Sequence, residues 1–176
     1  MGIRFGIDVG GSKIEIVALD EKRSELLRRR VPTPQGDYQQ TLRTIVELVD
    51  DAERQLGRRG SVGVGIPGAE ARFTGLIKNA NSTWLIGQPF RQDLQQLLKR
   101  AVRIANDANC FALSEAVDGA AAGVSVVFGV IIGTGVGGGI TVNGNVIGGA
   151  NRIAGEWGHN QLPGIRSEEH TSELQS

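Results

Sequence analysis

Cysteine and net charge are the two scarcest features of this sequence, and each scarcity excludes a class of protein. Cys110 is the only cysteine among 176 residues, so the chain can form neither an intramolecular disulfide nor a multi-cysteine zinc cage. Its 19 basic residues balance 19 acidic ones, which argues against a general surface for polyanions such as nucleic acid. With 40% hydrophobic and 22% charged residues, the composition is typical of a globular protein. The single cysteine favours a reducing, cytoplasmic setting.

Charge is also missing from one long stretch, because no charged residue occurs from Gly119 to Asn151. A run of this length is long enough to cross a membrane. Eleven glycines lie within it, however, and a spanning helix rarely tolerates that density. The residues from Met1 to Asp8 show no basic stretch followed by an apolar core, so we predict no signal peptide. We therefore expect buried strands and turns here, and no membrane segment.

The spacing of apolar residues predicts an alternation of strands and helices. The clearest helix is 37–56, in which apolar residues recur at intervals of three and four, and Gly57 is expected to end it. Short apolar runs that end at glycine or proline indicate strands. The predicted strands are 3–9, 14–18, 26–31, 62–66, 102–105, 124–132 and 140–142, the predicted helices are 37–56, 90–98 and 108–120, and turns are expected at 133–139 and 143–145.

Two of the strand-turn-strand units have clustered glycines at the bend, and both are candidate phosphate sites. Glycine leaves backbone N–H groups exposed in a concave turn, where they can hold phosphate oxygens. Asp8 could hold the magnesium that neutralises them, although a simple hairpin with a solvated Asp explains the first bend equally well. The first bend supplies Gly6, Asp8, Gly10, Gly11, Ser12 and Lys13, and the second supplies Gly133, Thr134, Gly135 and Gly137.

The second bend fits neither of two common phosphate-binding motifs. No Gly-Lys-Ser or Gly-Lys-Thr follows it, as a Walker loop requires, and it leads into a strand rather than into the helix of a dinucleotide fingerprint. Asp107 is a third candidate, because it stands where the strand at 102–105 gives way to the next helix, and ligands often bind at such junctions. Its spacing alone favours a helix N-cap, a position that Asp prefers.

Four further segments accompany the two bends in a fixed order. They are Ile-Pro-Gly at 66–68, Lys-Asn-Ala-Asn-Ser-Thr-Trp at 78–84, Ala-Asn-Asp-Ala-Asn-Cys at 105–110 and Ala-Gly-Glu-Trp-Gly-His at 154–159. Together these residues resemble the ROK family of sugar kinases, from about residue 3 to residue 163. Residues 79–90 and 114–123 resemble most closely the bacterial fructokinases of the manno(fructo)kinase type, with N-acetylglucosamine kinases and glucokinases as near neighbours.

The resemblance implies an α/β fold of the actin and hexokinase superfamily, which is built from paired ribonuclease-H-like domains. We expect a small domain at 1–118, with the phosphate loop and the catalytic Asp, followed at 119–165 by the start of the large domain. Residues 166–176 match nothing expected of a sugar kinase, and we interpret them as a non-native tail on a truncated gene, with a natural polar tail as the alternative. The resemblance also implies a homodimer when the protein is full length.

The resemblance further implies ATP-dependent phosphorylation of a hexose, in the first place of D-fructose to fructose 6-phosphate. Asp107 matches the family's catalytic base, which takes the proton of the sugar hydroxyl. Asn81, Asn106, Glu156 and His159 match the positions that contact the sugar. N-acetylglucosamine kinase and glucokinase activities are the alternatives within the family.

Two metals follow from the same resemblance. Magnesium near Asp8 would neutralise the phosphates of ATP. The histidine matched by His159 also ligates a structural zinc in the family, together with three cysteines in a Cys-x-Cys-Gly-x-x-Gly-Cys pattern that this sequence lacks. We therefore expect zinc in the full-length protein only.

A non-catalytic, sugar-sensing module of the ROK repressor type is the alternative from another functional class. Such a repressor carries a DNA-binding module before the kinase-like part, whereas the phosphate loop here begins at Gly6. The expected partners are accordingly a hexose and ATP, without nucleic acid or membrane.

Overall fold

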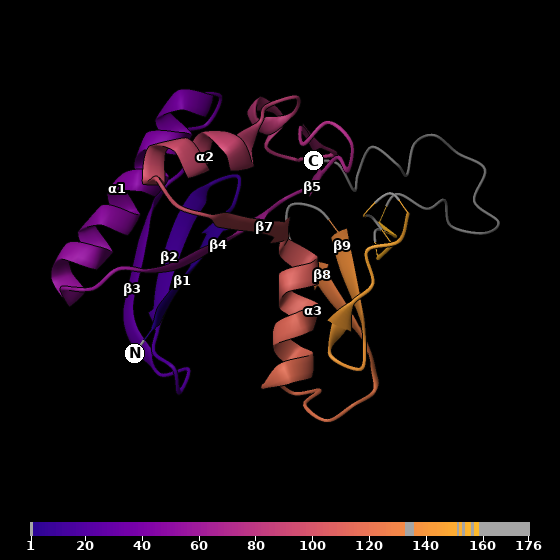
Figure 1. The fold of residues 1–176 in the computed structure, drawn as a ribbon. Helices are drawn as coiled ribbons and strands as arrows, with labels where there is room; N and C mark the ends of the chain where they lie inside the picture. Colours follow the sequence, from indigo (N-terminus) through magenta and orange to yellow (C-terminus); the bar gives the residue numbers. More distant parts are fainter. Residues whose placement is uncertain (1, 133–135, 151, 153, 156, 159–176) are drawn as a thin grey trace. The chain divides into compact units, whose positions relative to one another are not determined.

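The computed structural model describes residues 2–132, 136–150, 152, 154, 155, 157 and 158, and the chain divides into two compact units (Figure 1). The first unit is Met1–Asp107 and the second is Ala108–Ser176. The first contains a five-stranded sheet with two helices, and the second contains one helix and a three-stranded sheet. The domain boundaries at 118 and 165 stay a prediction.

A mixed sheet in the order β3-β2-β1-β4-β7 forms the frame of the first unit. Strand β1 pairs antiparallel with β2, which pairs antiparallel with β3, whereas β4 runs parallel to β1 and β7 runs parallel to β4. The carboxyl ends of β1, β4 and β7 therefore meet at one edge. The strands are β1 (Ile3–Val9), β2 (Lys13–Leu19), β3 (Glu25–Pro32), β4 (Gly60–Ile66) and β7 (Val102–Asn106).

One face of this sheet is apolar, and two helices cover it. Burial alternates strictly along β1, so that residues such as Ile7 are buried while Asp8 lies on the opposite face. Helices α1 (Tyr38–Leu56) and α2 (Phe90–Leu98) lie on the apolar face (Figure 1) and contribute Ile45 and Phe90 to the same buried cluster. The opposite face of the sheet, which carries Asp8, is left uncovered by α1 and α2.

The bounds of α1 follow from its two terminal residues. The Asp37 carboxylate accepts a hydrogen bond from the Gln40 N–H at 2.9 Å, as an N-cap does. Gly57 adopts the left-handed conformation (φ 63°) and its N–H donates to the carbonyl of Glu53. The helix predicted at 37–56 is thus confirmed, as is the shorter helix at 90–98.

An ion pair between Glu53 and Arg100 joins the end of α1 to the residues before β7. Two nearly parallel contacts, Nη1–Oε1 at 2.5 Å and Nη2–Oε2 at 2.8 Å, link side chains that are 13% and 15% exposed. Glu53 also accepts the Gly60 N–H, and Arg100 donates to the Gly60 carbonyl, each at 3.0 Å. The pair therefore fixes the first residue of β4 relative to both elements.

We expect Arg100→Ala to lower the free energy of unfolding by about 2 kcal/mol, because charge-assisted hydrogen bonds contribute about 1.5–3 kcal/mol. Hydrogen bonds from Arg100 hold the pKa of Glu53 below its usual value. This stabilisation is therefore complete above the ordinary glutamate pKa of about 4.3 and declines as the pH falls through the lowered pKa. Urea denaturation at pH 7 and pH 3 should show a smaller difference from wild type at pH 3.

Arg54→Ala is the matched control, because Arg54 is 76% exposed and, among the described residues, its one ion pair is with Asp51, which is 42% exposed. It should leave stability nearly unchanged at both pH values. If Arg100→Ala lowered the free energy of unfolding by the same amount at pH 3 as at pH 7, the ion pair with Glu53 would not be the source of the stabilisation.

Between β4 and α2 the chain forms a small two-stranded sheet and a single turn of 3₁₀ helix. Strand β5 (Ala69–Glu70) pairs with β6 (Ile77–Lys78), and η1 (Thr83–Leu85) follows. Gly68 has a φ of 131°, and a Cβ on it would lie 2.8 Å from the Lys78 carbonyl oxygen and 3.0 Å from Ala80. Only glycine therefore allows residues 78–80 to lie against the end of β4.

The second unit consists of α3 (Asp107–Val117), whose first residue belongs to the first unit, and an antiparallel sheet in the order β10-β9-β8. Its strands are β8 (Val126–Ile132), β9 (Val136–Val142) and β10 (Asn145–Val146). The helix lies directly on the sheet, since a Cβ on Gly129 would lie 3.0 Å from that of Ala112. Strand β8 is at the sheet edge and exposes alternate apolar side chains, namely Val126, Phe128, Val130 and Ile132.

The turn predicted at 133–139 is wrong for its second half. Residues 136–139 belong to β9, where Gly137 pairs with Ile131 and Gly138 pairs with Val130. The reason is close packing: a Cβ on Gly139 would lie 2.4 Å from the Ala108 carbonyl oxygen, and one on Gly138 would lie 2.5 Å from the Gly155 carbonyl oxygen. Other boundaries shift by two or three residues, since α3 ends at 117 and β8 begins at 126. None of the described helices is long and apolar enough to cross a membrane.

Candidate functional site

The three parallel strands of the first unit bring polar residues that are far apart in the sequence to one edge. Asp8 in β1 is aligned with Gly65 in β4, and Gly65 is aligned with Ala105 in β7. Neighbouring strands lie about 4.8 Å apart, so Asp8 and Ala105 are separated by about 10 Å across the sheet. Asn106 and Asp107 directly follow Ala105. Binding at the carboxyl ends of parallel strands is the rule in such sheets.

The junction predicted at Asp107 is present in the structure. Strand β7 ends at Asn106, which is buried at 8% exposure, and α3 begins at Asp107, which is half-buried. A carboxylate at this point is placed at the sheet edge by the strand before it and oriented by the helix after it. Its role as the catalytic base is a proposal, developed below.

The first glycine bend is held from one side by the residues that follow β3. The Thr33 hydroxyl donates to the Gly10 carbonyl at 2.8 Å, the Thr33 N–H donates to the Ser12 carbonyl at 3.0 Å, and the Gln35 side chain donates to the Gly11 carbonyl at 2.9 Å. The bend is therefore fixed through its carbonyl oxygens, while Gly11 and Ser12 remain exposed. This arrangement suits a backbone cradle for an anion.

Asp8 lies next to a second carboxylate, Glu15, its partner on β2. The loss of surrounding water raises the pKa of the Asp8 carboxyl above its usual value, and repulsion from Glu15 adds to this rise, whereas Lys13 and Arg30 oppose it. A cation near Asp8 would favour the ionised form.

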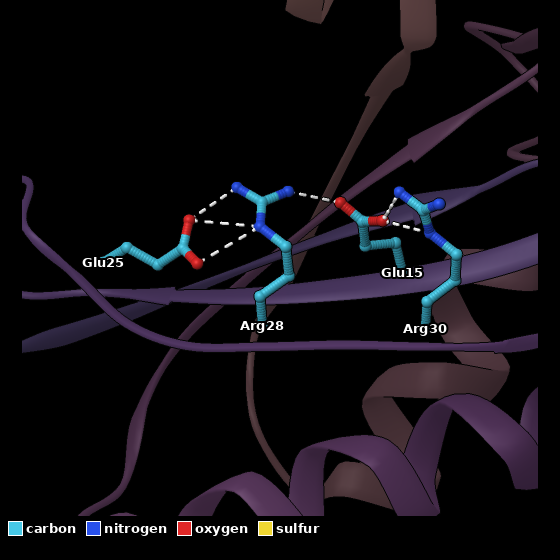
Figure 2. A network of polar contacts seen from close by, with 4 residues as sticks. All are labelled: Glu15, Glu25, Arg28 and Arg30. Atoms are coloured by element: carbon cyan, nitrogen blue, oxygen red, sulfur yellow. Dashed lines mark hydrogen bonds and ion pairs between the residues drawn. The ribbon is translucent and has the colours of Figure 1, made fainter.

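Glu15 itself is bound by two arginines of β3 (Figure 2). Arg28 and Arg30 both donate to its carboxylate, and Arg28 also binds Glu25 at 2.6 Å. Burial acts to raise the pKa of Glu15, but the hydrogen bonds from Arg30 and Arg28 outweigh it and hold this pKa below its usual value. Glu15 is therefore an anion whose charge is largely compensated.

Magnesium fits the donor chemistry of this edge as an ion carried by phosphates. Among the described residues, no group of three or more His, Cys, Asp or Glu side chains is placed to hold a metal ion. Asp8 offers one carboxylate, and Mg²⁺ is commonly bound by one or two carboxylates together with phosphate oxygens. Asp8 is thus the residue that would hold the ion.

The segment that carries Asn81 is anchored at the same edge. Gly68 at the end of β4 contacts residues 78–80, as described above. At the base of the loop, the Gly87 N–H donates to the Ile77 carbonyl at 2.8 Å, and the Trp84 indole donates to the Thr41 hydroxyl at 3.2 Å. Asn81 is exposed on this anchored loop and is therefore accessible to a ligand.

Part of the predicted site falls on residues whose arrangement is not described. Gly137 is described and lies in β9 rather than in the predicted turn, and its contact with phosphate stays a prediction. Five predicted site residues lie outside the described residues: Gly133, Thr134, Gly135, Glu156 and His159. The zinc expected at His159 is therefore untested.

Sequence reasoning missed the cluster of Glu15, Arg28 and Arg30 beside Asp8. No motif marks it, because its members come from two strands whose register becomes known only in the folded sheet. The one available signal was the alternation of strand side chains, which places Arg28 and Arg30 on one face and Arg29 on the other.

Comparison with known proteins identifies the family. The chain matches the ROK family over residues 4–172, a range that reaches into the segment predicted to be a non-native tail. It is 48% identical over 159 residues to the N-acetyl-D-glucosamine kinase of Yersinia pestis bv. Antiqua, and 46% identical to that of Pectobacterium atrosepticum. These alignments cover 90% of this chain but 62% and 52% of the relatives. The chain thus spans little more than half the length of the curated relatives it matches.

Solved structures agree with this assignment. A ROK hexokinase from Thermus thermophilus superimposes with a TM-score of 0.76 at 33% identity, over 91% of this chain and 53% of that one. A ROK glucokinase from Streptomyces griseus, in complex with glucose and AMPPNP, gives a TM-score of 0.78 at 28% identity, over 92% and 51%. These likenesses confirm the predicted α/β fold of the actin and hexokinase superfamily. The relatives named above do not support the fructokinase type, and the chain is a member of the ROK family.

Proposed function

We propose that this chain is part of an ATP-dependent hexose kinase. The observation that carries the proposal is the single sheet edge at which Asp8, the first glycine bend, Asn106 and Asp107 meet, in a chain that belongs to the ROK family. Phosphoryl transfer to a sugar needs an acceptor for the hydroxyl proton, a clamp on the sugar and neutralisation of the phosphate charge. Each need has a candidate residue at this edge.

Asp107 is the proposed proton acceptor. Its carboxylate is half-buried at the start of α3, where it can accept the proton of a hydroxyl bound at the edge. Asn106, the adjacent residue, and Asn81, on the anchored loop, are proposed to hold neighbouring hydroxyls through their side-chain amides. We retain Glu156 and His159 as proposed sugar contacts on the resemblance alone.

The exposed backbone of Gly11 and Ser12 is proposed to hold phosphate oxygens of the nucleotide. Magnesium supplies charge neutralisation when it is bound with these phosphates. Asp8 would hold the ion through its carboxylate, and Lys13 adds a positive charge at the end of the same bend. The reactive phosphate would then be presented toward the carboxyl ends of β4 and β7.

N-acetyl-D-glucosamine is the preferred candidate among hexoses, ahead of D-fructose. The support is the 46–48% identity to relatives that are N-acetyl-D-glucosamine kinases. The expectation of fructose rests on the resemblance of residues 79–90 and 114–123 to fructokinases, which is weaker support than sequence identity over 159 residues. Glucose is the third candidate, since one solved relative is a glucokinase with glucose bound.

A coupled kinase assay on a full-length protein that contains this sequence tests the proposal. We expect the highest kcat/KM with N-acetyl-D-glucosamine, when it is compared with fructose, glucose and mannose at one ATP concentration. A higher kcat/KM with fructose would refute N-acetyl-D-glucosamine as the preferred substrate but would still support hexose kinase activity. Sugar binding by calorimetry without turnover of any of the four sugars would refute the kinase itself.

A further inference from the structure

The face of the first sheet opposite α1 and α2 carries a row of three charged residues that begins at Asp8. Asp8 in β1 is aligned with Glu15 in β2, and Glu15 is aligned with Arg30 in β3. Because all three side chains leave the sheet on the same face, the row runs directly outward from the proposed magnesium ligand.

Two neighbouring residues of this row, Asp8 and Glu15, carry the same charge, which is unfavourable unless a positive charge lies beside them. Like charges directly opposite each other on neighbouring strands destabilise a sheet, and Asp8 faces Glu15 in this way. Arg30 compensates the pair by binding the Glu15 carboxylate through Nε and Nη2. Its positive charge also reaches Asp8, where it favours the ionised carboxylate.

The two arginines on Glu15 are not equally available to a ligand. All three nitrogens of the Arg28 guanidinium bind Glu15 or Glu25 (Figure 2). Arg30 uses Nε and Nη2 on Glu15, so that, within the described part of the chain, its Nη1 has no protein partner. The Arg30 side chain is 55% exposed, whereas that of Glu15 is 14% exposed. The guanidinium is thus anchored on one side and open on the other.

We infer that Arg30 is a phosphate-binding residue of the nucleotide site, held in place by Glu15. Glu15 is then a positioning residue, because it fixes the guanidinium on the sheet face beside Asp8. The ligand is the terminal part of a triphosphate carried with magnesium, since an anchored guanidinium with a free N–H edge matches phosphate oxygens. This inference rests on the proposed function, whose nucleotide it assigns to a further residue.

The chain offers a matched control in the adjacent residue. Arg29 has the same charge and a similar exposure, but it lies on the opposite face, where it binds Gln55 at 2.6 Å and Asp51 at 3.4 Å on α1. Arg29→Ala and Arg30→Ala change the net charge equally. An effect of net charge alone would therefore appear in both variants. The action of the Arg30 charge on Asp8 would be restored fully by Arg30→Lys, whereas a guanidinium contact would be restored only in part.

The experiment measures binding of magnesium AMPPNP to the full-length protein by calorimetry, alongside the KM for ATP and for sugar. Arg30→Ala should weaken nucleotide binding by about tenfold, Arg30→Lys should recover part of it, and Glu15→Gln should weaken it less than Arg30→Ala does. The KM for sugar should stay close to wild type in Arg30→Ala, and the melting temperature should fall slightly, because Arg28 still neutralises Glu15. Arg29→Ala should bind like wild type.

Two results would overturn the inference: unchanged nucleotide affinity in Arg30→Ala, or an equal loss in Arg29→Ala and Arg30→Ala. The binding arm separates this outcome from a failure of the proposed function. If no sugar is phosphorylated but Arg30→Ala alone weakens AMPPNP binding, the kinase proposal fails and the phosphate contact stands. If sugar is phosphorylated and Arg30→Ala binds AMPPNP normally, only the phosphate contact fails.

Discussion

Asp107→Asn in the full-length protein is expected to reduce kcat by about a hundredfold or more while sugar affinity changes little, because general-base catalysis contributes about 10²–10⁴-fold. Asparagine keeps the shape and one acceptor oxygen of the side chain at the start of α3. It cannot accept the proton of the sugar hydroxyl. Steady-state kinetics and calorimetric sugar binding separate these two effects.

Asp37→Asn is a suitable control for the loss of an Asp carboxylate. Asp37 caps α1 through the Gln40 N–H, and asparagine caps helices about as well as aspartate does. Its kcat should equal that of wild type. Near-normal turnover in Asp107→Asn would remove Asp107 from the proposed mechanism and leave it as the acidic first residue of α3.

Gly139→Ala is expected to destabilise the second unit by about 3 kcal/mol, at the upper end of what overpacking usually costs. The added Cβ would lie 2.4 Å from the Ala108 carbonyl oxygen and 2.9 Å from both the Ala108 carbonyl carbon and the Ala112 Cβ. Two of these atoms are backbone atoms of α3, so no flexible side chain can yield. The helix must move away from β9, and hydrogen exchange of β8 and β9 should accelerate.

Gly137→Ala tests whether this effect comes from the contact or from the loss of a glycine. Gly137 is in the same strand, and a Cβ on it would meet Ala108 Cβ at 3.5 Å, an ordinary van der Waals distance. Its exchange rates should stay near those of wild type. If both variants exchange equally fast, close packing of α3 on Gly139 is not what limits the stability of this unit.

Helices and strands are predictable from the sequence where a residue type favours a single local structure. Asp37 and Gly57 bracket an apolar spacing of three and four, and the helix between them has the predicted bounds. Glycine is ambiguous, because it allows tight turns and also allows close packing of neighbouring helices and strands. The sequence predicts the first role for Gly138 and Gly139, but they serve the second: Gly138 lies close to Gly155, and Gly139 lies close to α3.

Contacts between residues far apart in the sequence could not be predicted, for a different reason. The pairing of Glu53 with Arg100 joins residues 47 positions apart, and the row from Asp8 through Glu15 to Arg30 depends on strand register. The motifs pointed to Asp8 and Asp107 separately, but their common edge arises because β4 lies between β1 and β7. The sugar could not be read from the motifs either, because the family's members share them.

The edge strand β8 bears on how the chain behaves as a purified sample. Residues 126–132 contain no charge and no proline, and their outward side chains are Val126, Phe128, Val130 and Ile132. Proteins usually protect such an edge with lysine, proline or a bulge, because its unpaired N–H and C=O groups can form hydrogen bonds with a strand of another molecule. Within the described residues no further strand lies beside this edge, so we expect a concentrated sample to form oligomers and precipitate, and Val130→Lys to keep it in solution.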